Sequence, residues 1–163
     1  MLMPQAMRLT SIFLLTLSSG CTTTGSVALR LDGSPVPQEC PEEAKKAMRY
    51  MGLHVGDSVL VDLDANQTGS RRPIFYDGPV ESVMREEFGP FRVLSRLYGR
   101  VWISGPQVVI RYYEAQSIDG ERIPLCAVAR LGDDQMRKLP ESKPGNAILY
   151  GSVAAAFIVD AFR

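Results

Sequence analysis

Few residues in this sequence could support nucleophilic chemistry. The only histidine, His54, precedes Asp57 by three positions, and Cys40 lies earlier in the chain. A thiol, an imidazole and a carboxylate could act as nucleophile, base and orienting group if the fold brought them together. Nothing in their spacing requires this, and a surface or loop histidine is the simpler interpretation. We therefore predict that the protein is not an enzyme.

Metal binding has little support. Asp62, Asp64 and Asn66 alternate like the start of a calcium loop, but Gln67 and Pro73 occupy the positions where such a loop needs glycine and an acidic residue. One histidine and two further cysteines do not make up the N/S ligand set of a typical zinc site. The chain also lacks a glycine-rich phosphate loop and a nucleophile elbow. We expect no metal and no cofactor.

The N-terminal residues have the pattern of an export signal. Arg8 precedes an apolar run, Leu9–Leu17, and the small residues at 18–20 lead directly to Cys21. A positive region, a short apolar region and small residues describe a secretory signal. The run is shorter than the ~20 apolar residues that a spanning helix needs. We expect residues 1–20 to be a signal peptide, 21–25 a tether and 26–163 a single β-rich envelope domain.

This N-terminal pattern resembles the bacterial lipoprotein signal, in which small residues stand directly before a cysteine. The resemblance implies that Cys21 is acylated and anchors the chain to a membrane. Thr22, rather than aspartate, follows it, which favours the outer membrane, with the domain facing the periplasm. An ordinary signal peptide with a chance cysteine, or a cytosolic protein with an apolar N-terminal segment, would give a similar pattern.

Charge and length limit the class of protein further. Removing residues 1–20 leaves 143 residues (163 − 20), the size of one ordinary domain. The removed part carries one charge, Arg8, so 17 basic and 18 acidic side chains remain, a formal balance of −1. Nucleic-acid binding needs a concentrated basic face, and we expect no nucleic-acid partner.

Two cysteines remain beyond Cys21. In an exported protein, Cys40 and Cys126 are most simply a disulfide. Cys40 also stands just before a predicted helix, where a thiolate would be stabilised and reactive. Two inert, unpaired thiols are the third alternative.

Periodicity predicts one helix and several strands. Over Pro41–Met51, four apolar residues recur with helical spacing, acidic residues fill the first turn, and Gly52 follows. From residue 57 the period changes to two. Residues 91–130 predict a three-stranded antiparallel meander with an Asp-Gly turn at 119–120. Residues 147–162 are apolar throughout and favour a central strand. Short strands are also expected at 26–31 and 74–78, and residues 80–88 are ambiguous.

These elements predict a mainly β fold, an antiparallel sandwich or partly open barrel with one short α-helix. Within the meander, alternation predicts an aromatic and basic sheet face. Its members are Arg96, Tyr98, Arg100 and Trp102 on one strand, with Arg111 and Tyr113 on the next. Such a face could stack on sugar rings or dock a protein, although tyrosine, tryptophan and arginine stems also pack in second layers.

The stretch Leu97–Arg130 resembles a family of small predicted bacterial lipoproteins of unknown function. Its rhythm of strand, hairpin, strand, Asp-Gly turn and strand is also similar to the TrbI-type β-barrel domain of type IV secretion systems. Neither resemblance supplies functional residues.

The sequence thus supports two hypotheses. The first is a lipid-anchored cell-envelope protein that acts as a non-enzymatic binding or assembly component, with the membrane and an envelope protein as partners. The alternative is a glycan-binding or enzyme-inhibitor lipoprotein that uses the aromatic and basic face.

Overall fold

The structure is a computed structural model that describes residues 27–132 and 136–163. The expected signal peptide, 1–20, and the whole of the expected tether, 21–25, with Cys21, lie outside these residues. The described elements are β1 (Gln38–Glu39), α1 (Glu42–Tyr50), β2 (Ser58–Asp62), β3 (Ile74–Phe75), β4 (Gly78–Met84), β5 (Arg96–Trp102), β6 (Gln107–Gln116), β7 (Arg122–Arg130), β8 (Met136–Arg137), β9 (Ala147–Ile148), β10 (Val153–Ile158) and β11 (Ala161–Phe162).

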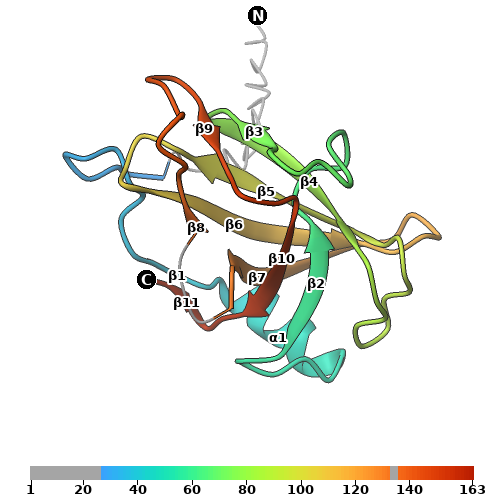
Figure 1. The fold of residues 1–163 in the computed structure, drawn as a ribbon. Coiled ribbons are helices and arrows are strands. Elements are labelled where there is room, and N and C mark those ends of the chain that lie inside the picture. Colours follow the sequence, from blue (N-terminus) through green and yellow to red (C-terminus); the bar gives the residue numbers. More distant parts are fainter. Residues whose placement is uncertain (1–26, 133–135) are drawn as a thin grey trace, which may run out of the picture.

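Six of the strands close into an antiparallel barrel (Figure 1). Their order is β5-β4-β2-β10-β7-β6, and pairing between β6 and β5 completes the ring, while β8 adds to β6 as an extra strand. Closure matters because it pairs the strand edges that an open sheet would expose. The prediction of a mainly β fold with one short helix is confirmed, and the barrel is closed rather than partly open.

Alternating side chains fill the barrel interior. Val59 and Val61 of β2, Leu97 and Val101 of β5, and Ile110 of β6 are almost fully buried, as their period of two predicts. Burying each such side chain stabilises the fold by roughly 1.5–3 kcal/mol. The two-residue period of apolar side chains therefore favours strands, and the same side chains form the core of the barrel.

Small residues make room for large ones inside this narrow barrel. The buried Tyr112 on β6 pairs with Ala127 on β7, and Ala129 of β7 pairs with Ala156 of β10. β10 lies between β2 and β7, so a central strand is confirmed for residues 153–158. The single element expected over 147–162 is instead divided into β9, β10 and β11, which belong to three different sheets.

The helix α1 packs against β7 (Figure 1). Ala44 and Met48 are buried on the side toward the barrel, and the Met48 Sδ accepts the Cys126 backbone N–H at 3.5 Å. Gly52, with a φ of 72°, follows the helix in the left-handed conformation that glycine adopts without strain. The predicted helix 41–51 is confirmed to within a residue at each end.

Three segments could not be assigned correctly from their local sequence pattern. The strand expected at 26–31 is wrong within the described residues, because the chain reverses at Asp32-Gly33 and leaves only an isolated bridge between Leu29 and Pro35. The ambiguous segment 80–88 begins in strand β4, since a period of two runs through Val80 and Met84. The polar stretch after residue 131 carries no strand period, yet it contains β8, whose Met136 is fully buried.

Candidate functional site

The disulfide predicted from the sequence is present. Cys40, just before α1, is bonded to Cys126 of β7 with a Cα–Cα distance of 6.0 Å, and both residues are buried. The Cys40 N–H also donates to the Asp160 carbonyl at 3.1 Å, and the Val159 N–H donates to the Cys126 carbonyl at 3.0 Å. The disulfide joins the start of α1 to the middle of β7, and the two hydrogen bonds hold the residues that follow β10 at the same point. Its sulfur atoms are not available as nucleophiles.

His54 faces solvent, whereas both cysteines are buried. Its Nδ1 lies 3.5 Å from the Asp57 carboxylate, which also accepts the His54 backbone N–H at 2.8 Å. The pair closes the turn between α1 and β2. This geometry matches the interpretation of His54 as a loop residue.

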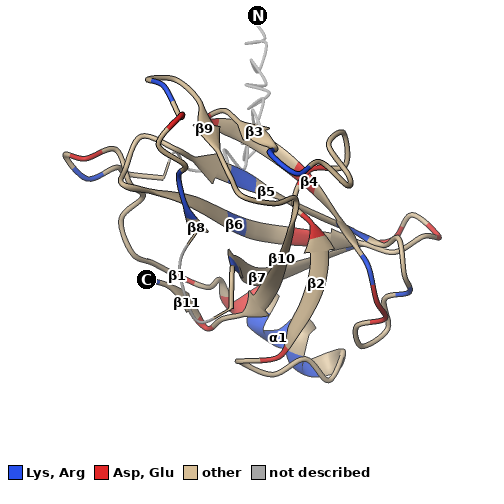
Figure 2. Ribbon diagram, viewed as in Figure 1, with Lys and Arg blue, Asp and Glu red and all other residues tan. Residues whose placement is uncertain are grey.

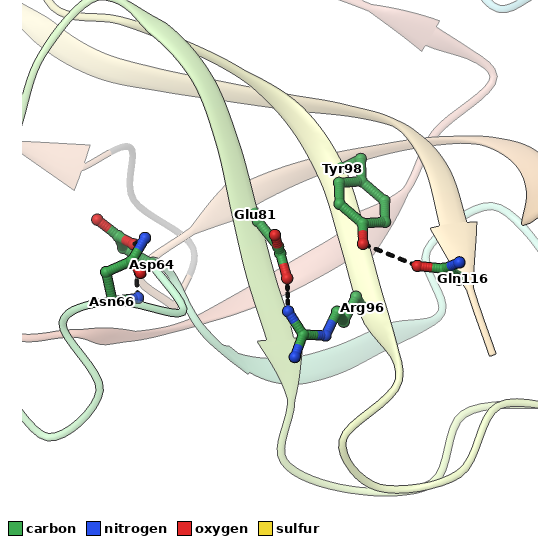
Figure 3. A network of polar contacts seen from close by, with 6 residues as sticks. All are labelled: Asp64, Asn66, Glu81, Arg96, Tyr98 and Gln116. Carbon is green, nitrogen blue, oxygen red and sulfur yellow. Dashed lines mark hydrogen bonds and ion pairs between the residues drawn. The ribbon is translucent and has the colours of Figure 1, made fainter. Parts of the chain in front are cut away.

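The Asp64 carboxylate is used within its own turn (Figure 3). It accepts hydrogen bonds from the Asn66 N–H at 2.8 Å and from the Gln67 side-chain amide at 2.7 Å. Gln67 in turn bonds both the N–H and the C=O of Ile74, so the loop is tied to β3. Within 27–132 and 136–163, no group of three or more His, Cys, Asp or Glu side chains is placed to hold a metal ion.

The predicted aromatic and basic face lies on the outside of the barrel. In β5, Leu97 and Val101 point inward, so Arg96, Tyr98, Arg100 and Trp102 alternate outward. Arg100 is directly opposite Arg111 of β6. The strand pairing shifts by one residue at Tyr113, which marks a β-bulge. Ile110 and Tyr112 are fully buried before the bulge and Ala115 after it, so the alternation is offset by one residue there.

Half of this face is covered by other parts of the chain. Trp102 is 4% exposed and Arg111 is 2% exposed. The Arg111 guanidinium lies 5.6 Å from the Trp102 ring and 5.1 Å from the Phe162 ring of β11. Tyr113 meets Phe162 edge to face, with the ring centroids 5.2 Å apart. These contacts form a second packed layer between the barrel wall and β11.

The N-terminal segment completes that layer. Arg111 donates hydrogen bonds to the carbonyl oxygens of Val36 at 3.0 Å and Pro35 at 3.4 Å. Burial lowers the pKa of Arg111, and it raises the pKa of the Tyr113 phenol, an effect that the neighbouring Arg111 charge opposes. Arg111 thus joins two segments of the chain that are remote in sequence.

The other half of the face is polar and partly exposed. Arg96 pairs with Glu81 of β4, and the Tyr98 hydroxyl donates to Gln116 Oε1 at 2.8 Å (Figure 3). Arg122 of β7 lies over the Tyr98 ring at 4.7 Å and bonds the Glu114 carboxylate at 2.9 Å. We call this set the polar ladder; its members are Glu81, Arg96, Tyr98, Glu114, Gln116 and Arg122.

The structure therefore divides the six predicted face residues between two environments. Arg96 and Tyr98 belong to the polar ladder, while Trp102, Arg111 and Tyr113 belong to the covered layer. Arg100 is exposed at the boundary, with its guanidinium 5.8 Å from the Trp102 ring. Alternation alone could not separate the two halves, because the covering segments come from the ends of the described chain.

The partners in the polar ladder were missing from the sequence prediction. Glu81, Glu114, Gln116 and Arg122 become neighbours of Arg96 and Tyr98 only through strand register. The Asp119-Gly120 turn was the available signal, since a tight hairpin there places Arg122 opposite Gln116, as the structure shows. Figure 2 shows basic and acidic residues interspersed along the described chain.

A separate polar network lies inside the barrel. The Tyr112 hydroxyl and the Ser82 Oγ lie 2.7 Å apart, and Ser82 donates to the Leu63 carbonyl at 2.7 Å. Burial strongly raises the pKa of the Tyr112 phenol, and the Ser82 hydrogen bond lowers it by less. The network satisfies two hydroxyls in an otherwise apolar interior, which identifies it as structural.

Fold and surface together define the class: a disulfide-clipped, closed antiparallel β-barrel with one packed helix and an exposed polar ladder. Searches with the whole chain found no matching protein family and no matching curated protein. Among the described residues, no helix has the length and apolar character that crossing a bilayer would require.

Proposed function

We propose that the chain is a non-enzymatic binding or assembly component of a bacterial cell envelope, held at a membrane by a lipid on Cys21. The observation that carries the proposal is the placement of Cys21 directly after an apolar run and three small residues. The proposed site of attachment is the outer membrane, with the barrel facing the periplasm.

The disulfide supports export. Disulfides form and persist in oxidising compartments such as the bacterial periplasm and are rare in the cytosol. The Cys40–Cys126 disulfide is buried and joins two segments that are far apart in the sequence, which is the arrangement of a structural disulfide. A chain with this bridge suits the environment that the N-terminal signal implies.

The polar ladder supports a protein partner over a glycan. Stacking on sugar requires an open aromatic ring, but Arg122 lies over the Tyr98 ring and Trp102 is buried. The ladder instead presents arginine, tyrosine and carboxylate side chains of both signs, and arginine and tyrosine are enriched at the centres of protein interfaces. We therefore place the partner surface on the ladder and rank the glycan-binding alternative second.

Lipid attachment is tested by growing cells with a clickable palmitate analogue. The wild-type chain should take up the label and fractionate with membranes, whereas Cys21→Ala should do neither. Unchanged fractionation and labelling in Cys21→Ala would overturn the anchor.

Partner binding is tested by cross-linking in intact envelopes and affinity capture. We expect one stoichiometric protein partner that is lost with Arg96→Ala/Tyr98→Ala. The matched control, Arg71→Ala/Tyr150→Ala, removes the same residue types from exposed positions outside the ladder and should retain the partner. Recovery of cell-wall glycan alone would favour the alternative, and equal recovery with both double variants would remove the ladder from the proposal.

A further inference from the structure

A cavity of about 160 Å³ opens on the outside of the barrel, beyond the covered layer. Its lining residues come from the N-terminal segment, the β5–β6 hairpin and β6, and residue 163. These parts of the chain lie on the left of Figure 1. Arg30, Arg111 and Arg163 line it together with Ser34 and Gln107. The volume is well above the roughly 10–15 Å³ that a single ordered water needs.

Arg111 is the buried member of this set. Its guanidinium offers five N–H donors, and the hydrogen bonds to Pro35 and Val36 engage two of them. Among residues 27–132 and 136–163, no carboxylate forms an ion pair with it. Arg111 as a whole residue is 2% exposed, and a buried guanidinium without an opposite charge is costly, so the cavity wall favours an anion.

Neighbouring charges add to this preference. Arg100 stands directly opposite Arg111 across the β5–β6 pair, and like charges in that relationship are destabilising. Burial is the largest cause of the lowered pKa of Arg111. The Arg30 charge lowers this pKa further, while Tyr113 raises it. A bound anion would relieve the repulsion among these groups.

One carboxylate also lines the cavity. Asp32 accepts the Ser34 N–H at 2.9 Å and the Ser34 hydroxyl at 2.6 Å, so its oxygens are engaged in the local turn. These hydrogen bonds from Ser34 hold the pKa of Asp32 below its ordinary value. The lining side chains thus carry three positive charges and one negative charge.

We propose that this cavity binds a phosphate group, held by Arg30, Arg111 and Arg163 with the Gln107 amide as an additional donor. Arginine is suited to this task because its planar fork matches the geometry of phosphate oxygens. A phosphate monoester carries about −1.5 to −2 charges at pH 7, which complements the side-chain charge of the cavity. The site does not depend on the proposed function.

Two sources could supply the phosphate group: a free phosphate compound or the headgroup of a phospholipid. Only the second rests on the proposed lipid anchor. Arg30 lies nine positions after Cys21 (30 − 21), a span of at most about 30 Å of extended chain. An anchored protein would hold the cavity within that reach of the membrane surface.

The test begins with inorganic phosphate titrated into the full chain by calorimetry, with sodium chloride adjusted to hold ionic strength constant. We expect saturable binding and a rise in Tm that follows phosphate concentration. Arg30→Gln/Arg163→Gln, which changes only exposed side chains, should weaken binding at least tenfold. Arg71→Gln/Arg92→Gln makes the same charge change outside the cavity and should bind like the wild type.

The absence of saturable binding, or equal weakening by both double variants, would overturn the site and indicate general charge screening. Glycerol 3-phosphate and vesicles containing phosphatidylglycerol then identify the source. Displacement of phosphate by the vesicles supports a headgroup, and displacement by glycerol 3-phosphate alone supports a free compound. Cys21→Ala should still bind inorganic phosphate even if the lipid anchor proves wrong, so the two proposals fail separately.

Discussion

The Arg111 guanidinium lies 5.6 Å from the centre of the Trp102 ring, on a barrel face that the rest of the chain covers. A cation over an aromatic ring contributes about 0.5–2 kcal/mol, with the larger values at desolvated sites. Trp102, the only tryptophan in the sequence, is therefore a packing residue of the second layer.

Trp102→Ala should consequently lower the free energy of unfolding by about 3–5 kcal/mol, because it leaves a cavity beneath Arg111. Arg100→Ala, which removes an exposed partner of the same ring, should cost less than about 1 kcal/mol. Urea unfolding followed by circular dichroism measures both. A Trp102→Ala protein as stable as the wild type would contradict the packing role of Trp102 and favour a role in binding.

A second prediction concerns the closure of the barrel between β5 and β6. Gly99 lies opposite Tyr112, and a Cβ at Gly99 would fall 2.1 Å from the Arg111 carbonyl oxygen. Because that atom belongs to the backbone, the two strands must separate to admit a methyl group. Gly99→Ala should destabilise the fold by about 1–3 kcal/mol or more.

Gly151→Ala is the matched control, since a Cβ there meets nothing within 4 Å. Its free energy of unfolding should equal or slightly exceed that of the wild type. Equal stability of the two alanine variants in urea would show that β5 and β6 do not approach so closely in solution.

A third prediction concerns the disulfide. Its cysteines are 86 positions apart, and for a loop of that length the chain-entropy model gives a stabilisation of roughly 4–5 kcal/mol. Cys40→Ala/Cys126→Ala should lose about this amount in urea unfolding. Reductant should destabilise the wild type similarly and leave the double variant unchanged; a shift in the double variant would mean that the reductant acts elsewhere.

The sequence predicted the β-rich class because the residues carry a physical period. Val59, Val61 and Leu63 recur at every second residue, the period at which a strand buries one face. The helix followed from equally local signals, the acidic first turn and Gly52 at its end. The two cysteines could be paired because a disulfide is the simplest state of two cysteines in an exported protein, which the N-terminal pattern predicts.

Neither the closure of the barrel nor the covering of half of the aromatic and basic face could be predicted from such local patterns. Phe162, Pro35 and Val36 contact Arg111, whose guanidinium lies beside Trp102, and they reach it only through tertiary folding. The same limit applies to Arg122 over Tyr98, since strand register decides which side chains meet. Local chemistry thus predicted which residues share a face, and long-range packing decided which of them remain accessible.

The last prediction concerns alkaline pH. Burial raises the pKa of Tyr112 above its ordinary value of 10.0, so the folded state retains the phenol proton at a pH where the unfolded chain has lost it. A group with a raised pKa in the folded state contributes its full stability below the unfolded pKa and loses it as pH rises. The free energy of unfolding should therefore fall as pH increases above about 10.

Tyr112→Phe separates this effect from general alkaline repulsion. At neutral pH the variant should lose about 0.5–1.5 kcal/mol, because Ser82 keeps its bond to the Leu63 carbonyl but loses the phenol. Above pH 10 its stability should decline less steeply than that of the wild type. Tyr50→Phe, at a position that is 94% exposed, should follow the wild type throughout. Parallel declines for wild type and Tyr112→Phe in pH-dependent urea unfolding would show that the buried phenol does not control alkaline stability.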